Sequence, residues 1–367
     1  MKNILQTGVQ NSRNVGRYIF GGGCLSELES LLKNRRTQHE GPVIFMVDEF
    51  FRDNQEGLVE LPCKSGDQLI YVDTQKEPTT EGIDNFVRQV SGDNNLPCAV
   101  VGIGGGSTLD SAKAVSNLLT NEGCASDYQG WDLLRFPGVY KIGIPTISGT
   151  GAETTRTCVI TNKANDLKLG MNSEYTVFDQ IILDPDLTAT VPRDQYFYTG
   201  MDAWIHCIEA LSGSYRNPIG DAFSRQAIEL CREVFGDSDM MNEKNRSNLM
   251  VASYLGGCAI ATSYVGVVHP FSAGLSVVLG LHHCVSNCIA FLALESFYPA
   301  AFKEFIGFVE TQAVTIPKNV CEGLSDSEFE ALYNATIVHE KPLVNALGTD
   351  FHNVLTKKRV RQIFEAM

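Results

Sequence analysis

Short apolar runs alternate with amphipathic stretches through the first half of the chain. Two stretches with helical periodicity, Thr79–Val90 and Ser107–Leu119, stand between runs that have the length and composition of buried strands. These runs are Val43–Val47, Leu69–Val72, Ala99–Ile103 and Val139–Ile144. Such an alternation predicts a parallel sheet with helices on its faces.

The pattern changes after Asp184-Pro185. Cys158–Thr161 and Ile181–Leu183 still have strand character, and we expect them to extend the sheet in antiparallel fashion. Beyond them follow long stretches with helical periodicity: 195–212, 218–235, 246–264, 271–300 and 326–340. We therefore predict an α/β N-terminal domain, residues 1–185, and an all-α C-terminal domain, residues 186–367.

The composition excludes several classes of protein. The 367 residues carry a formal net charge of −14, which argues against nucleic acid or an anionic membrane as a partner, because both attract Lys and Arg. No apolar run approaches the roughly 18 residues that a membrane span needs. Residues 1–14 are polar and do not resemble a secretory leader, and the eleven cysteines show no framework spacing. We expect a cytoplasmic protein with reduced thiols.

Three consecutive glycines follow the apolar run Ala99–Ile103. Gly104, Gly105 and Gly106 allow the backbone to approach a ligand closely, and Ser107 then begins a helix whose free N–H groups suit a phosphate. The GxGxxG fingerprint is not met, because Ser107 stands where its last glycine would be. An ordinary glycine-rich turn remains the alternative, but three glycines after a buried strand favour a phosphate site.

A second loop of small residues, Pro145–Glu153, follows the next apolar run and carries the hydroxyls of Thr146, Ser148 and Thr150. Together the two loops indicate two walls of one nucleotide site at the carboxyl ends of the strands. Asp48, at the end of another strand, is placed to accept the ribose hydroxyls of NAD and to disfavour NADP. A loop or helix-capping role for Asp48 is equally consistent with the sequence.

Four residues of the second half have the spacing of a metal site. Asp202 and His206 stand four apart, so they share one face of a helix. His269 and His283 reach one ion only if the chain turns between them, because a straight helix would separate them by roughly 21 Å. Gly274 and Gly280 permit such a turn. One carboxylate and three imidazoles suit Fe(II) or Zn(II) better than Ca or Mg, although the first pair alone would also be explained by a shared hydrogen bond.

These motifs together resemble the iron-containing (group III) alcohol dehydrogenases, whose fold is related to that of dehydroquinate synthase. The most specific parts are Gly104–Lys113, Pro145–Glu153, Asp184–Thr188 and the four spaced residues above. The resemblance implies a dinucleotide-binding first domain and a metal- and substrate-binding second domain. In that family the four residues bind iron, sometimes zinc, and the two loops hold NAD(P). Asp110 and Lys168 match positions near the nicotinamide and its ribose. Many family members are dimers.

Within the family, the stretches Tyr128–Asp132 and Val139–Asn162 resemble the branch that oxidises the C8 primary alcohol of 3-deoxy-D-manno-octulosonate (Kdo), a sugar acid of lipopolysaccharide. The family chemistry is hydride transfer from a metal-bound alcohol to the nicotinamide. An anionic substrate also needs a cationic partner, for which the candidates are Lys168, Arg156, Arg193 and Arg216. For most of the four, a solvated surface charge is the better interpretation.

The chain departs from the family at one position. Many members carry a second His four residues after the third metal ligand, and here that position is Ala273. We hypothesise that His282, next to His283, takes over part of that role as a catalytic residue, with Lys168. A supporting or surface role for His282 is the main alternative.

Three other functions remain open from the sequence. They are a dehydroquinate-synthase-like lyase that regenerates its NAD, a non-catalytic sensor of NAD or metal, and an oxidase that passes the electrons to oxygen. A dehydrogenase of the same family that acts on another small alcohol or polyol is a further alternative. Cys284 and Cys288, beside His283, could indicate a thiolate site, but packing is the more common role of such cysteines.

Overall fold

A computed structural model describes residues 12–53, 61–91 and 96–367. It divides into two compact units, one of Arg13–Val191 and one of Ser12 with Pro192–Met367. The sequence analysis placed this boundary after residue 185. Residues 1–11, which make up most of the polar N-terminal segment, lie outside the described residues.

The first unit contains a six-stranded sheet in the order β1-β9-β6-β4-β2-β3, and all of its strand pairs are parallel. The strands are β1 (Arg17–Phe20), β2 (Val43–Asp48), β3 (Gln68–Val72), β4 (Ala99–Gly104), β6 (Lys141–Pro145) and β9 (Gln180–Leu183). The predicted parallel sheet is thus confirmed. The antiparallel direction expected for Ile181–Leu183 is wrong: β9 is buried along its whole length and lies between β1 and β6, a position typical of interior parallel strands.

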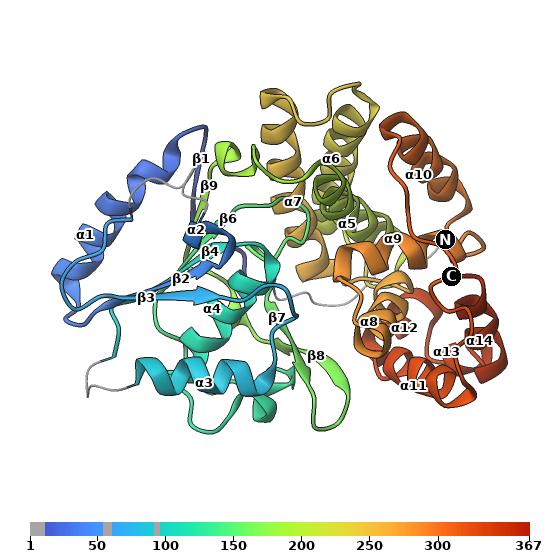
Figure 1. Ribbon diagram of the computed structural model, residues 1–367, viewed down its shortest axis with the longest axis horizontal. Coiled ribbons are helices and arrows are strands. Elements are labelled where there is room, and N and C mark those ends of the chain that lie inside the picture. Colours follow the sequence, from blue (N-terminus) through green and yellow to red (C-terminus); the bar gives the residue numbers. More distant parts are fainter. Residues whose placement is uncertain (1–11, 54–60, 92–95) are drawn as a thin grey trace. The chain divides into compact units, whose positions relative to one another are not determined.

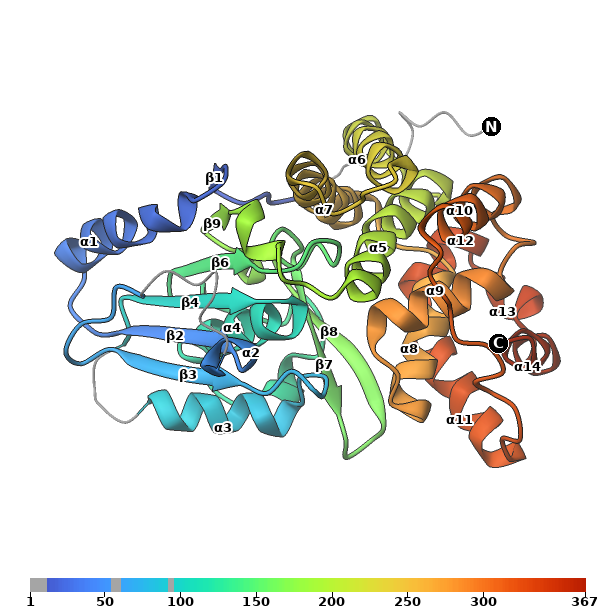
Figure 2. The ribbon, with the colours of Figure 1, turned by 45° about the horizontal axis from the view of Figure 1, so that its top comes forward.

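Two apolar cores lie on the two faces of this sheet, and side chains of alternate strand residues point into one or the other. Ile44 and Met46 of β2 pack into one core, and Val43, Phe45 and Val47 pack into the other. The first core is closed by α3 (Thr80–Val90) and α4 (Gly106–Leu118), and the second by α1 (Leu28–Gln38), with the short α2 (Phe50–Asp53) following β2 (Figures 1 and 2). Burial on both faces explains why the strands are continuous apolar runs.

A smaller sheet in the same unit has the order β5-β8-β7. Its strands are β5 (Gly130–Trp131), β7 (Thr157–Asn162) and β8 (Leu167–Asn172). β7 and β8 form an antiparallel hairpin, so Cys158–Thr161 is an antiparallel strand as expected. The expected extension of the main sheet is wrong, because β7 lies in this separate sheet and pairs with β8, a strand that was not predicted.

The second unit is helical in the described residues. Its helices are α5 (Arg193–Ser212), α6 (Pro218–Gly236), α7 (Glu243–Ser263), α8 (Val268–Leu279), α9 (His283–Ala293), α10 (Pro299–Gln312), α11 (Asp326–Ile337), α12 (Glu340–Leu347), α13 (Phe351–Val354) and α14 (Lys357–Glu365). α5 packs against α6, α7 and α9. Its Trp204 is fully buried among Phe291, Phe305 and Phe308.

One predicted helix, 271–300, is wrong as a single element. Gly280 ends α8 with a φ of 69°, and α9 begins three residues later at His283. A left-handed residue interrupts a helix at little cost only when it is glycine, so Gly280 makes the turn that the spacing of His269 and His283 required. Gly274 lies inside α8, where a Cβ atom would come within 3.0 Å of Thr336 Oγ1.

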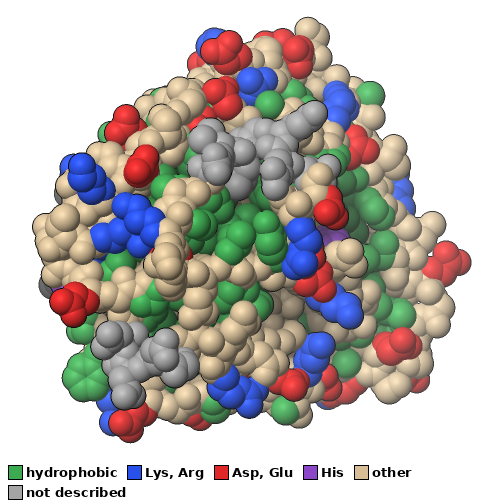
Figure 3. Space-filling model, turned by 60° about the vertical axis from the view of Figure 1, so that its left-hand side comes forward, with side chains coloured by type: hydrophobic (Ala, Val, Ile, Leu, Met, Phe, Trp, Pro, Cys, Tyr) green, Lys and Arg blue, Asp and Glu red, His purple; other side chains and the backbone are tan. Residues whose placement is uncertain are grey.

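Surface charge is mixed in sign. On the face shown in Figure 3, Lys and Arg side chains are interspersed with Asp and Glu. None of the described helices is by itself long and apolar enough to span a membrane, and α7 with α8 passes that test only as a pair bent by 104°.

Candidate metal centre and cofactor site

One face of α5 carries three ionisable side chains. Asp202, His206 and Glu209 follow at intervals of four and three residues, so they line the same side of the helix. Both carboxylates are completely buried, with 0 % of each residue exposed. Two carboxylates at such sites are costly unless cations or hydrogen-bond donors face them.

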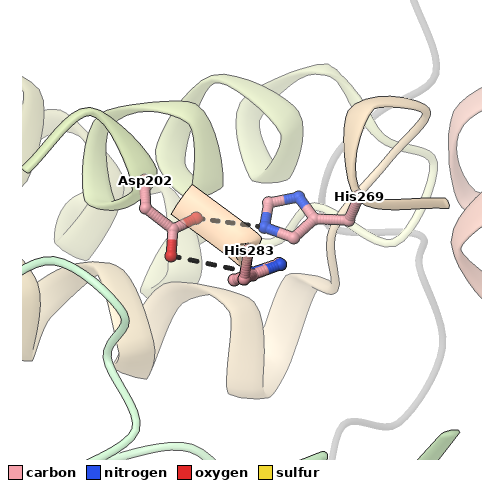
Figure 4. A group of neighbouring side chains, drawn as sticks. All are labelled: Asp202, His269 and His283. Atoms are coloured by element: carbon pink, nitrogen blue, oxygen red, sulfur yellow. Dashed lines mark hydrogen bonds and ion pairs between the residues drawn. The ribbon is translucent and has the colours of Figure 1, made fainter. Parts of the chain in front are cut away.

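The facing groups come from α8 and α9. His269 lies in the first turn of α8, and His283 is the first residue of α9 after the turn at Gly280. Figure 4 shows both rings directed at Asp202. His269 Nε2 lies 3.3 Å from Asp202 Oδ1, and His283 Nε2 lies 3.7 Å from Asp202 Oδ2. The three ligand atoms lie within 4.8 Å of one another, close enough to converge on one ion.

His206 joins this group through Asp202 and His269. Its Nε2 lies 3.4 Å from Asp202 Oδ1, and its ring stacks on that of His269 with centroids 4.6 Å apart. His206 therefore lies beside the cluster, whereas the ligand atoms that converge are those of Asp202, His269 and His283. The assignment of all four residues as metal ligands stays a prediction. The Nδ1 atom of His206 is buried and has no hydrogen-bond partner in the described part of the chain.

Asn287 is a member of this cluster that the sequence analysis missed. Its amide Nδ2 donates to Asp202 Oδ1 at 2.6 Å and lies 3.2 Å from His283 Nε2 and 3.4 Å from His269 Nε2. Asn287 follows His283 by one turn of α9, and this spacing was the only available signal. The thiol of Cys284 also faces Asp202, with Sγ 3.6 Å from Oδ2.

Glu209 is the second residue that was missed. It accepts a hydrogen bond from the Val268 N–H at 2.6 Å, and its other oxygen contacts His269 Nδ1. A carboxylate that contacts one ring nitrogen orients the other nitrogen toward a metal, as is common behind metal-bound imidazoles.

The buried carboxylate and the imidazoles of the cluster shift one another's pKa values. Burial alone would raise the pKa of Asp202, but the imidazoles of His206, His283 and His269 hold it well below its usual range. Burial lowers the pKa of His206 to about 4, so that ring is neutral. Burial also opposes protonation of His269, yet Glu209 and Asp202 raise its pKa to about 9.

This donor set fits a divalent transition metal. The convergence of one carboxylate with two imidazoles, with a third imidazole 3.4 Å from the same carboxylate, and a buried Asn287 Oδ1 without a hydrogen-bond partner in the described structure fit a bound divalent cation. Nitrogen-rich sites of this kind suit iron or zinc.

In the α/β unit, the two small-residue loops lie against each other. β4 and β6 are neighbours with Gly104 beside Pro145, and the Thr146 N–H donates to Gly104 O at 3.1 Å. A Cβ atom on Gly105 would lie 2.7 Å from Ile147, and one on Gly106 would lie 3.3 Å from Thr150. Glycine at these positions therefore permits the close packing of the two loops.

The loops lie where the strand order reverses. After β2 the chain adds β3 on one side, whereas β4 returns to the other side of β2 and leads on to β6. Ligands of parallel α/β sheets bind at such a switch point, outside the carboxyl ends of the strands. Ser107 is in the first turn of α4 here, and the buried hydroxyl of Ser148 has no partner in the described structure.

Asp48 lies at the same edge, at the end of β2. Its Oδ1 accepts hydrogen bonds from the Phe50 N–H and the Thr74 hydroxyl, both at 3.0 Å. The carboxylate is therefore held in place by a turn, which agrees with its capping interpretation and leaves a role toward ribose as a prediction.

Asp110 and Lys168 are held by other groups of the α/β unit. Asp110 Oδ2 accepts from the Val159 N–H at 2.8 Å, and burial raises the pKa of Asp110 to about 6 against the opposing charge of Lys113. Lys168 Nζ lies 3.0 Å from Glu77 Oε1. Their assignment to the nicotinamide end stays a prediction.

The remaining candidates are less well placed. His282 is exposed at the start of α9, and no contact in the described structure joins its ring to the four ligands, while Ala273 is buried in α8. Its catalytic role stays a hypothesis. Each cation proposed for an anionic substrate already has a carboxylate neighbour: Lys168 has Glu77, Arg156 has Asp132, Arg193 has Asp194 and Arg216 has Asp221.

Comparisons with known proteins agree with this arrangement. Residues 16–185 match the family model described as iron-containing alcohol dehydrogenase, and residues 196–315 match the C-terminal model of the Fe-containing alcohol dehydrogenase family. A sulfoacetaldehyde reductase of Bilophila wadsworthia is 34 % identical over 287 residues, 76 % of this chain and 72 % of that protein. An NAD-dependent methanol dehydrogenase of Bacillus methanolicus is 32 % identical over 74 % of this chain and 71 % of its own.

A solved structure shows the same fold. The sulfoacetaldehyde reductase of Bifidobacterium kashiwanohense, in complex with NAD+, aligns with a TM-score of 0.76 at 20 % sequence identity, over 95 % of this chain and 99 % of its own. The predicted fold class, an α/β first domain with a helical second domain, is therefore confirmed.

Proposed function

This chain belongs to the iron-containing alcohol dehydrogenase family, and we propose that it interconverts a primary alcohol and its aldehyde by exchanging a hydride with NAD. Membership of this family makes it an oxidoreductase that acts on alcohols. The observation that carries the mechanism is the convergence of His269 and His283 on the buried Asp202.

Asp202, His206, His269 and His283 would hold the metal, with iron favoured by the family and zinc accepted by the same ligands. When bound, the metal supplies a Lewis acid that makes the alcohol hydroxyl more acidic. Asp202 supplies the negative charge at the centre, and Asn287 holds its Oδ1 by a hydrogen bond. The apolar packing of α5 around Trp204 keeps these side chains on a rigid helix.

The α/β unit would bind the cofactor. Gly104–Gly106 and the first turn of α4 offer backbone N–H groups to the pyrophosphate, and Thr146, Ser148 and Thr150 offer hydroxyls. Asp48 and Lys168 are proposed for the riboses, and Asp110 for the neighbourhood of the nicotinamide. We favour NAD over NADP because Asp48 would repel a 2′-phosphate and because a relative that is 32 % identical is NAD-dependent.

For the substrate we propose Kdo, oxidised at its C8 hydroxyl, on the strength of the Tyr128–Asp132 and Val139–Asn162 resemblance. A second candidate is sulfoacetaldehyde, favoured by the 34 % identity to the reductase of Bilophila wadsworthia. Both are small molecules that carry an acid group and react at a terminal carbon. We also propose that the protein is a cytoplasmic homodimer. The structure describes all eleven cysteines, and no disulfide joins any of them.

The test is an assay of metal-reconstituted protein with Kdo, sulfoacetaldehyde, methanol and 1,3-propanediol, following NADH absorbance and oxygen consumption together. Net NADH formed from Kdo, or consumed with sulfoacetaldehyde, supports the proposal and identifies the substrate. Activity on the simple alcohols alone would refute an acidic substrate. Oxygen consumption without NADH would indicate an oxidase, turnover without net NADH a lyase, and metal and NAD binding without turnover a sensor.

A further inference from the structure

Three hydrogen-bond donors converge on the buried carboxylate of Glu209. The Val268 N–H donates to Oε1 at 2.6 Å, the hydroxyl of Tyr298 lies 3.5 Å from the same oxygen, and His269 Nδ1 contacts Oε2. The Tyr298 oxygen itself accepts from the Val267 N–H at 3.2 Å, so its proton is directed at Glu209. An ionised carboxylate only accepts, and this environment matches it.

This arrangement determines where the His269 ring carries its proton. Because Glu209 Oε2 can only accept, Nδ1 of His269 must be the donor. Nε2, on the opposite side of the ring and 3.3 Å from Asp202 Oδ1, is then the nitrogen that is freed when a cation binds. His206 differs, because its buried Nδ1 has no hydrogen-bond partner in the described residues.

We propose that Glu209 is a positioning residue that holds His269 in its Nδ1–H form, with Nε2 presented to the metal, and thereby sets the affinity of the site. This inference rests on the proposed metal centre. The competing explanation is structural: Glu209 would only anchor the segment before α8. That segment packs closely against Tyr298, because a Cβ atom on Gly266 would lie 2.6 Å from the Tyr298 hydroxyl.

Replacement by glutamine separates the two roles. In Glu209→Gln the volume is kept, but one acceptor becomes an amide donor. If the amide oxygen stays with the Val268 N–H, which can only donate, the amide nitrogen faces His269 Nδ1. The ring must then accept at Nδ1 and carry its proton on Nε2, the atom that the metal requires. Glu209→Asp keeps two acceptors and should restore the native proton position in part.

The experiment combines two measurements on wild type, E209Q, E209D and the control Y298F. Nitrogen NMR of metal-free protein labelled at histidine, recorded above the His269 pKa of about 9, reports which nitrogen is protonated, with His269→Asn identifying the signal. Competition titration with Zn2+ against a chelator reports affinity. We expect the Nδ1–H form in wild type, E209D and Y298F, the Nε2–H form in E209Q, and Zn2+ affinity lower in E209Q by about 10- to 100-fold.

An Nε2–H form of His269 in the wild-type protein would overturn the proposal, and this measurement needs no variant of Glu209 to fold. E209Q with Zn2+ affinity within twofold of wild type would also overturn it. A loss of affinity in Y298F as large as in E209Q, with an unchanged proton position in both, would establish the structural explanation instead. Failure of wild type to bind Zn2+ would refute the metal centre while leaving the NMR result interpretable.

Discussion

Replacing Asn287 by aspartate tests whether the cluster around Asp202 is built for a cation. The Asn287 amide donates to Asp202 Oδ1 at 2.6 Å. Asn287→Asp keeps the shape of the side chain and turns this donor into a second carboxylate. The variant should therefore be destabilised without metal and stabilised by metal more strongly than wild type.

The separation of the two groups sets the size of the effect. Two charges 2.6 Å apart repel by about 6 kcal/mol at an effective dielectric constant of about 20. Protonating one of the two carboxyls costs less. The ordinary pKa of Asp lies roughly three units below neutral pH, and at about 1.36 kcal/mol per pKa unit this cost is about 4 kcal/mol. Protonation therefore limits the loss to about 4 kcal/mol. The folded variant then holds one more proton than the unfolded chain, so its stability falls as pH rises from about 4 to about 7.

The assay is urea unfolding of chelator-treated protein at several pH values, repeated with Zn2+. Asn287→Leu is the matched control, because it removes the donor without adding charge; its loss, about 2 kcal/mol, should not depend on pH. The reasoning is refuted if N287D loses no more stability than N287L at neutral pH, or if Zn2+ stabilises N287D no more than wild type.

Two further substitutions test the α/β unit. Gly104→Ala places a Cβ atom 2.7 Å from Thr108, so fluorescence titration should show NADH binding weakened about tenfold or more; Zn2+ affinity should be unchanged, and unaltered NADH binding would contradict the assignment of this loop. Burial lowers the pKa of Lys141 to about 8 from 10.5, so Lys141→Met should raise the unfolding free energy by up to about 3 kcal/mol below pH 8. That gain should fall as pH rises above 8 and vanish only above the unfolded pKa of 10.5, where the folded and unfolded lysines are both neutral. Asp179 keeps its ion pair with Arg13, at 2.9 Å, in the variant; a thermal melt with no gain near neutral pH would refute the argument.

Much of the fold could be predicted because its determinants are local. Buried parallel strands are continuous apolar runs, and β2, β3, β4 and β6 all overlap the predicted runs. The turn between β4 and α4 could also be predicted, because its three glycines directly follow an apolar run in the sequence. The helix predicted over 271–300 was wrong because its apolar periodicity continues past Gly280, and a pattern of side chains does not report the φ of one residue.

The clustering of Asp202, His269 and His283 was predictable because a carboxylate and imidazoles at these spacings are rare and chemically specific. Asn287 and Glu209 were not, because an amide or a carboxylate on a helix is usually solvated. Their roles exist only where α5, α8 and α9 meet: Asn287 holds Asp202 across two helices, and Glu209 contacts a ring sixty residues away in the sequence.

The class of fold, the need for a turn between His269 and His283, and the kinds of atom offered to a metal all follow from the sequence. These depend on backbone preference, burial and spacing within a few turns of chain. Only the tertiary structure decided which strand lies beside which, which glycine makes the turn, and which nitrogen of His269 faces Asp202. The physical reason is that hydrogen bonds in a buried cluster depend on the direction of each group, and directions are set by helices that pack from distant parts of the chain.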